Sequence, residues 1–296
     1  MRVPVSVRGG SYDGASFHEL IRKRGIDNNV LKVFRQIVYA YYERNARKFP
    51  WRNDALTPYH VFVSEIMLQQ TQAERVAQKY PGFIALFPDF SSLALTPLEQ
   101  LLRAWQGLGY NRRALALRRS AEIIINRHSG LVPNNADELK ALPGIGHATA
   151  SSILAFAFNK PVVFIETNIR AVYIHLFFKD RADVADGEIL PLVERSLDRK
   201  NPRRWYNALM DYGVMLKSIH HNPARRSKHY KKQSVFHGSH RQKRSTILKM
   251  ALDHPGMSAR KISTLLNSST TDANEVLAEL VDEGFLFREH GRYFVR

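Results

Sequence analysis

The chain of 296 residues contains no cysteine. Disulfides, thiol nucleophiles, cysteine-ligated zinc and iron–sulfur clusters all need cysteine sulfur, so the composition excludes each of them. The sequence also lacks any apolar run near the roughly 18 residues of a membrane helix, and its N-terminus lacks the pattern of a secretory signal. We therefore expect a cytoplasmic protein with no membrane span.

Acidic residues are scarce as well. The chain has 27 Asp and Glu against 44 Lys and Arg, which gives a formal net charge of +17. Such a surplus favours a polyanionic partner, because basic side chains that neutralise phosphates release condensed counterions. Nucleic acid is the leading candidate, and an acidic membrane surface is the alternative.

Strand patterns are nearly absent before residue 280, whereas apolar residues recur at helical spacing from residue 28 onward. We therefore expect a mainly α chain, with residues 28–216 as one helical domain. Residues 1–27 show no sustained period and are predicted to be a poorly ordered leader. Residues 217–242 are rich in basic side chains and are predicted to be a linker.

Residues 243–296 have a different character. Three helical patterns are followed by a hairpin pattern over 285–296, an order that resembles a winged helix. The third pattern, residues 271–283, carries an acidic face that is unfavourable in a major groove, so packing or protein binding is the alternative to DNA binding. That face consists of Asp272, Glu275, Glu279, Asp282 and Glu283.

A Gly-Ile-Gly turn at residues 144–146 separates two helical patterns. Glycines allow a tight turn and a close approach to a ligand, and the second helix would point its unpaired N–H groups at the turn. A DNA phosphate suits such a site. An ordinary tight turn between helices is the alternative interpretation.

Two carboxylates are candidates for chemistry on a sugar. Glu166 precedes an amphipathic helix, where it could be only a cap, or could stabilise an oxocarbenium-like deoxyribose as a base departs. Such a reaction needs a protonated group as well. Glu65 could keep a raised pKa if the region of Trp51 and Tyr59 desolvates it, or could be an ordinary solvated helix charge.

Six segments, in this order, resemble the helix-hairpin-helix DNA glycosylases, specifically the MutY-type adenine glycosylases. They are FPWR at 49–52, PY at 58–59, SEIMLQQTQ at 64–72, WQGLGY at 105–110, LPGIG at 142–146 and MDYG at 210–213. The resemblance covers about residues 30–216, and SEIMLQQTQ is its most specific segment. It implies the two-lobed helix-hairpin-helix DNA glycosylase fold, here with a C-terminal winged-helix (α+β) module.

The resemblance also implies roles for individual residues. Glu65 matches the acid that protonates adenine N7, Glu166 occupies the place of the catalytic Asp, and Asn168 is its helper. Trp51 is expected to line the base pocket, and Gln70 to intercalate at the lesion. Leu108 and Tyr110 match the turn near the opposite base, and Gln69 is assigned to the same base-pocket and intercalation group. The hairpin residues expected on the DNA backbone are Gly144, Ile145, Gly146, His147 and Thr149. A monovalent cation is a further candidate ligand of this hairpin.

The chain departs from that family at three places. Glu166 is one methylene longer than Asp, and a displacement of about 1 Å can cost on the order of 100-fold in rate. Ala148 stands where bifunctional relatives carry a Schiff-base lysine, so we expect no lyase activity. The four cysteines of the family's [4Fe–4S] cluster are missing, so we expect no cluster.

In place of the cluster the chain has a basic segment. We expect electrostatic contacts to the DNA backbone there, and a flexible linker is the alternative. The basic residues assigned to this role are Arg225, Arg226, Lys228, Lys231 and Lys232. The histidines nearby are irregularly spaced and lack acidic neighbours, so we expect no metal site. They are His220, His221, His229, His237 and His240.

Together these features predict a monofunctional DNA glycosylase that flips and hydrolyses a mismatched base, most readily adenine opposite 8-oxoguanine or G. A thymine or uracil mismatch glycosylase is the alternative enzyme. A non-catalytic lesion-binding or regulatory protein is the alternative from another class. We expect a monomer in the cytoplasm, associated with the nucleoid, whose partner is double-stranded DNA with a mismatch or damaged base.

Overall fold

The computed structural model describes residues 5–7, 10–12, 14–53 and 55–296. The chain divides into two compact units that alternate along the sequence. Unit 1 comprises Met1–Glu65, Pro133–Ala141 and Ile145–Lys231, and unit 2 comprises Ile66–Val132, Leu142–Gly144 and Lys232–Arg296. The mainly α fold is confirmed. The predicted domain of residues 28–216 is thus divided between both units.

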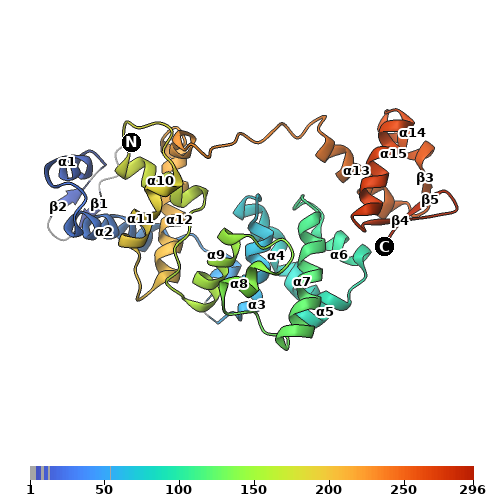
Figure 1. Cartoon of the computed structure of the whole chain (residues 1–296), viewed down its shortest axis with the longest axis horizontal. Helices are drawn as coiled ribbons and strands as arrows, with labels where there is room; N and C mark the ends of the chain where they lie inside the picture. The colour runs from blue at the N-terminus through green and yellow to red at the C-terminus, as the bar shows by residue number, and fades with distance from the viewer. Residues whose placement is uncertain (1–4, 8–9, 13, 54) are drawn as a thin grey trace. The chain divides into compact units, whose positions relative to one another are not determined.

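Unit 1 is built from helices around an aromatic core. Its elements are β1 (Val5–Val7), β2 (Gly10–Tyr12), α1 (Gly14–Arg24), α2 (Asn28–Asn45), η1 (Pro50–Arg52), most of α3 (Pro58–Leu68), α8 (Ala136–Lys140), α9 (His147–Phe158), α10 (Thr167–Phe177), α11 (Asp186–Ser196), α12 (Pro202–Ile219) and η2 (Pro223–Arg226). Helices α10 and α12 pack side by side (Figure 1).

Phe34 of α2 shows how the core of unit 1 is assembled. Its ring meets those of Tyr173, Phe177 and Trp205 edge to face, with centroids 5.1 to 5.5 Å apart. Edge-to-face contacts at this distance are favourable because the positive edge of one ring meets the negative face of the other. Helices α2, α10 and α12 are therefore held together by one aromatic cluster, and α10 carries Glu166 as its N-cap.

The predicted disorder of residues 1–27 is wrong where the structure describes this segment. Residues 14–24 form α1, and Phe17 is fully buried, with its ring 5.5 Å from that of Phe177. The apolar residues Phe17, Leu20 and Ile21 have helical spacing, but the run is too short to stand out from its polar surroundings. Residues 1–4, 8, 9 and 13 lie outside the described residues.

The predicted basic linker or loop of residues 217–242 contains short helical segments. Residues 217–219 complete α12, and residues 240–242 begin α13 (His240–Asp253). Between them, η2 docks on unit 1, because Val184 N donates to the Arg226 carbonyl at 3.0 Å and Lys228 N donates to the Val184 carbonyl at 3.0 Å. The chain passes to unit 2 after Lys231.

Unit 2 has a helical part and a C-terminal part. The helical part contains α4 (Ala73–Leu86), α5 (Phe90–Leu95), α6 (Leu98–Trp105) and α7 (Arg112–His128). The C-terminal part contains α13, β3 (Met257–Ser258), α14 (Ala259–Leu266), α15 (Thr270–Asp282), β4 (Leu286–Glu289) and β5 (Arg292–Val295). The three strands form an antiparallel sheet in the order β3-β5-β4. The winged-helix assignment of this part stays a prediction.

Among the helices that the structure describes, none combines the length and the hydropathy needed to cross a membrane.

Candidate active site

The carboxyl group of Glu65, on α3, is buried away from solvent. Burial raises its pKa to about 7, and the negative charge of Glu166 acts in the same direction. A hydrogen bond with Ser152 of α9 and the charge of Arg52 lower the pKa, but by less. A carboxyl group with such a pKa keeps a substantial fraction of its proton at neutral pH and can act as a general acid.

Glu166 is the N-cap of α10 and does cap the helix. Its Oε1 accepts from the backbone N–H of Asn168 at 2.7 Å and of Ile169 at 3.2 Å, and the Asn168 side-chain amide lies 3.4 Å from Oε2. Burial raises the pKa of Glu166, whereas these bonds and the charge of Lys217 lower it. The cap therefore provides donors that favour the ionised carboxylate.

The two carboxylates lie close enough in unit 1 that the charge of Glu166 contributes to the pKa of Glu65. Two interacting carboxyl groups in a desolvated site avoid a double negative charge by sharing one proton. Burial raises the pKa of both groups, but Glu166 has the backbone donors and the nearby lysine, and only for Glu65 does the charge of the other carboxylate raise the pKa further. The arrangement therefore assigns the proton to Glu65 and the negative charge to Glu166.

One face of α12 lies against Glu166 and Asn168. An ideal Cβ on Gly213 would come within 2.4 Å of the Asn168 carbonyl oxygen, so only glycine permits this approach. Met210 Sδ, on the same helix, is 3.8 Å from the Asn168 amide nitrogen. Lys217 follows Gly213 by one helical turn, is partly buried, and acts electrostatically on Glu166. The sequence reading missed Lys217, although its spacing from Met210 and Gly213 would have placed it on this face.

Asp211 anchors the segment that carries Trp51. Its carboxylate is buried and accepts from Arg47 N at 2.9 Å, from Arg47 Nε at 2.6 Å, and from both terminal nitrogens of Arg52 at 2.8 and 3.0 Å. Trp51 lies between them in the chain and stacks on Phe49, with ring centroids 4.8 Å apart. Asp211 belongs to the recognised MDYG segment, but its role was not predicted.

Gln69 and Gln70 follow α3 and differ in exposure. Gln69 Nε2 donates to the Gly144 carbonyl at 3.1 Å, which links the end of α3 to the hairpin within unit 2. Gln70 is exposed and has φ +54°, a left-handed conformation that costs a non-glycine residue about 1 kcal/mol or more. The residue expected to enter the DNA stack is thus held at the surface in a constrained turn.

The turn at residues 105–110 corrects one expectation. Leu108 is only 2% exposed, so its side chain belongs to the core of unit 2 and not to the surface of the turn. Tyr110 is partly buried with φ +49°, and its hydroxyl accepts from Arg241 Nη1 at 2.6 Å and also bonds the Gln233 amide. Burial of the apolar Leu108 side chain lowers the free energy of the folded state, which exposure at the surface of the turn would not do.

Arg113, at the start of α7, is a buried charged residue. It is 8% exposed and donates to five oxygen atoms between 2.8 and 3.1 Å away. The acceptors are the carbonyls of Ile66, Met67, Leu108 and Gly109 and the Thr71 hydroxyl. A guanidinium group satisfies this many acceptors because its donors form a rigid planar fork. Arg113 therefore joins the end of α3 to the turn at residues 105–110.

The hairpin at residues 144–146 is shaped by both glycines. Gly144 has φ +76°, and a Cβ there would lie 2.9 Å from Ala116 Cβ. Gly146 is the N-cap of α9, and Ile145 between them is 5% exposed and anchors the turn. His147 is exposed and Thr149 is partly buried in the first turn of α9. The start of α9 therefore has no side-chain cap, and the phosphate and cation assignments of this hairpin stay predictions.

Among the five basic residues predicted to contact DNA, Arg226 has a different role. Its guanidinium donates to the carbonyls of Phe178 at 2.7 Å and Ile174 at 3.2 Å, and also to that of Lys179. These carbonyls lie in the last turn of α10 and just beyond it, so Arg226 adds a donor at the C-terminal end of the helix. Arg225 is exposed and lies 2.9 Å from His221 Nε2. Lys228, Lys231 and Lys232 are exposed.

Histidines do approach one another in unit 1, with ring centroids of His175 and His220 4.5 Å apart. Burial and the neighbouring positive groups lower the pKa of His175 to about 4. Within residues 5–7, 10–12, 14–53 and 55–296, however, no three His, Asp or Glu side chains are arranged to hold a metal ion.

Comparison with known proteins agrees with this geometry. Residues 63–189 match the model of the HhH-GPD superfamily of base excision DNA repair proteins. The adenine DNA glycosylase of Buchnera aphidicola subsp. Baizongia pistaciae is 34% identical over 189 residues, covering 62% of this chain and 53% of that protein. That of Mycobacterium tuberculosis is 40% identical over 133 residues, covering 45% of this chain and 44% of that protein. The chain thus spans about half the length of these relatives.

Among solved structures, a thermostable thymine-DNA glycosylase is 26% identical, with a TM-score of 0.56 over 64% of this chain and 88% of that one. The order of the six motifs and the helical fold agree with the family match. Residues 63–189 therefore match the HhH-GPD superfamily of base excision DNA repair proteins, and the chain has MutY-like sequence motifs.

Proposed function

We propose that this protein is a DNA glycosylase of base excision repair that removes adenine from mismatches with 8-oxoguanine or G. The observation that carries the proposal is the buried pair Glu65 and Glu166, in which burial raises the pKa of Glu65 to about 7 and backbone donors at the start of α10 bond the carboxylate of Glu166. Relatives named adenine DNA glycosylase, at 34 to 40% identity, support adenine as the base.

In the proposed reaction the base is flipped out of the duplex. Glu65 gives its proton to the departing adenine, so that the electrons of the glycosidic bond leave with a neutral base. The carboxylate of Glu166 stabilises the positive charge that develops on the deoxyribose. Water then adds to the anomeric carbon and loses a proton, which leaves an abasic site.

The hairpin at residues 144–149 supports the DNA-binding part of the proposal. A tight glycine turn before α9 offers backbone N–H groups and the positive end of a helix dipole, which suit a phosphate. Ala148 cannot form a Schiff base, so we propose base removal without strand cleavage. The chain has no cysteine to hold a cluster, and its four exposed basic residues after α12 are proposed to contact the backbone instead.

The proposal is tested by incubating the protein with duplexes that carry A opposite 8-oxoguanine, A opposite G, T opposite G or U opposite G, followed by alkali. Product from the first two duplexes is expected. Glu166→Gln should abolish the product and leave duplex binding intact, because Gln keeps the cap and removes the charge. Absence of product from every duplex would refute the enzymatic proposal, and a covalent adduct trapped by borohydride would refute monofunctional action.

A thymine mismatch glycosylase is the second candidate. The solved thymine-DNA glycosylase matches 88% of its own length with this chain, more than the adenine glycosylases do, although at lower identity. Product from T opposite G, without product from either adenine duplex, would favour this candidate.

A further inference from the structure

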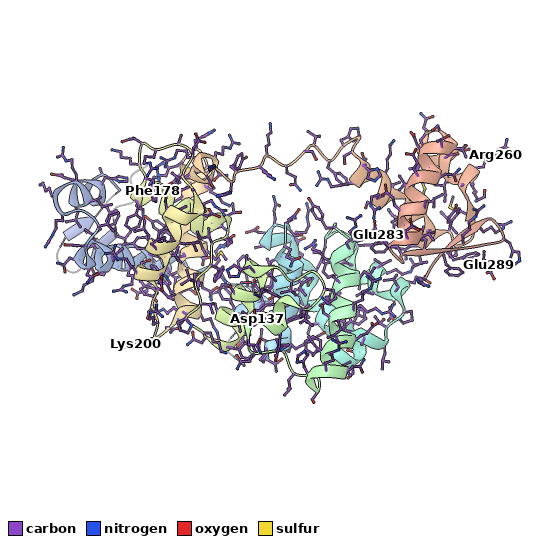
Figure 2. The ribbon with its side chains drawn as sticks, in the orientation of Figure 1. Asp137, Phe178, Lys200, Arg260, Glu283 and Glu289 are labelled. Carbon is purple, nitrogen blue, oxygen red and sulfur yellow. The ribbon has the colours of Figure 1, made fainter. Side chains whose placement is uncertain are left out.

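The third helix of the C-terminal part, α15, is not free to enter a groove of DNA. Glu279 pairs with Arg244 at 2.5 Å and with His240 at 2.9 Å. Glu283, labelled in Figure 2 at the end of α15, pairs with Arg112 of α7 at 2.5 Å and with Arg244 at 2.7 Å. The acidic face noted in the sequence therefore serves packing within unit 2.

A cavity of about 540 Å³ lies at another place in the C-terminal part. It is lined by residues 254–258 between α13 and α14, by Lys261 in the first turn of α14, and by residues 290–292 at the turn between β4 and β5. Four of its side chains are basic: His254, Lys261, His290 and Arg292. None of its lining residues, all of which are described, is acidic.

The cavity has a fixed framework. Strand β3 pairs with β5 through Ser258 and Arg292. Gly256 N donates to the Tyr293 carbonyl at 3.0 Å, and Arg292 Nη1 donates to the Gly256 carbonyl at 3.0 Å. Gly256 has φ +79°, and a Cβ there would come within 3.1 Å of the Phe294 ring. These hydrogen bonds connect the loop at Gly256, the strands β3 and β5, and the turn between β4 and β5.

Its electrostatics favour an anion. Lys261 and His290 have exposed side chains that nothing acidic in the lining neutralises. Ser258 caps α14, with its hydroxyl 3.3 Å from Lys261 N, so the positive end of this helix also faces the same region. Basic groups from separate segments, combined with a helix N-terminus, are the usual components of a phosphate site.

We propose that this cavity binds backbone phosphates of duplex DNA. The C-terminal part would then hold DNA through the β4–β5 turn and the start of α14, with α15 directed to packing. Phosphate contacts carry no base information, so the site would add affinity and orientation and leave base choice to the glycosylase site. The inference concerns binding and is independent of whether the protein excises a base.

The test compares the full chain with Lys261→Gln in duplex-binding titrations at several salt concentrations. The side chain of Lys261 lines the cavity, and that of its neighbour Arg260, labelled in Figure 2, does not. Arg260→Gln is therefore the matched control for net charge. Loss of one phosphate contact should lower the slope of log Kd against log salt by about 1, equally for matched and mismatched duplexes.

His290→Asn gives a second variant, because Asn tolerates the left-handed φ of +46° at this position. The double variant Lys261→Gln/His290→Asn should weaken binding further at low salt and keep the unfolding temperature of the parent. Binding by Lys261→Gln that equals binding by Arg260→Gln would overturn the proposal.

Inorganic phosphate distinguishes the source of the anion. If millimolar phosphate stabilises the parent but not Lys261→Gln against heat, while both bind duplex DNA equally, the cavity serves a free phosphate and the DNA proposal is wrong. If the parent excises no base and the Lys261 variant still shows the smaller salt slope, the proposed function fails and this inference stands.

Discussion

A methyl group at Gly213 is the sharpest test of how α12 positions the active site. Its ideal Cβ would lie 2.4 Å from the Asn168 carbonyl oxygen and 2.8 Å from the Asn168 carbonyl carbon and Cβ. Carbon atoms pack best at about 3.5 to 4.0 Å, so the two backbones must separate by roughly 1 Å in the Gly213→Ala variant. The obstacle is backbone, so no change of rotamer relieves it.

That displacement reaches Glu166 directly. The carboxylate of Glu166 is held by Asn168 N at 2.7 Å, and it should follow Asn168 when α12 moves. A misplacement of about 1 Å can cost about 100-fold in rate, and overpacking a core costs about 1 to 3 kcal/mol. We expect Gly213→Ala to lower the single-turnover excision rate about 100-fold and to lower the unfolding temperature, with duplex affinity unchanged.

Two other helical glycines provide the controls. A Cβ on Gly82 of α4 or on Gly187 of α11 would meet nothing within 4 Å. Alanine at either position should keep the excision rate and raise stability by up to about 1 kcal/mol. If Gly213→Ala has the excision rate and unfolding temperature of the parent, the close packing of α12 on Asn168 does not position Glu166.

Four further predictions concern Glu65, Asp211 and Arg113. Because burial raises the pKa of Glu65 from 4.5 to about 7, the folded state binds its proton more tightly than the unfolded chain. Its stabilising contribution is full below pH 4.5 and is lost as the pH rises through 7. Glu65→Gln should therefore abolish excision yet gain stability over the parent between pH 5 and pH 8, by up to about 3 kcal/mol; a gain independent of pH would contradict this. Excision by the parent should fall above about pH 7 as Glu65 loses its proton. Asp211→Asn leaves Arg47 and Arg52 without their buried partner and should cost about 3 to 5 kcal/mol in denaturant unfolding, whereas Asp253→Asn, at an exposed pair with Arg103, should cost about 1 kcal/mol or less. Equal losses in these two variants would refute the anchoring role of Asp211. Arg113→Met removes one donor from each of five oxygens and should lower stability by several kcal/mol, measured by thermal unfolding beside Arg112→Met, whose side chain is exposed.

Much of the fold could be read from neighbouring residues. Helix α10 begins where Glu166 precedes an apolar period, because capping and periodicity depend on residues only a few positions apart. The order of the six motifs pointed to the family without coordinates, and the missing cysteines led us to expect no cluster. The apolar pattern around Phe17 was too short to be recognised as a helix, so the sequence did not predict α1.

Burial of the polar and charged side chains was decided by tertiary structure. Arg113 and Arg226 look like surface charges in the sequence, yet one joins α3 to a distant turn and the other adds a donor at the C-terminal end of α10. Leu108, expected at the surface, is in the core. A guanidinium or a leucine is placed by partners dozens of residues away, and helical spacing contains no information about such partners.

In the active site, too, the sequence determined some properties and the tertiary structure determined others. The sequence alone determined that Glu65 and Glu166 are the two candidate carboxylates, because residue type and motif order are local properties. The pKa values of the two groups depend on the burial of both, on the backbone donors at Glu166, and on the approach of Gly213 and Lys217 from α12. A pKa depends on burial and on every nearby charge, and these exist only once α3, α9, α10 and α12 have come together.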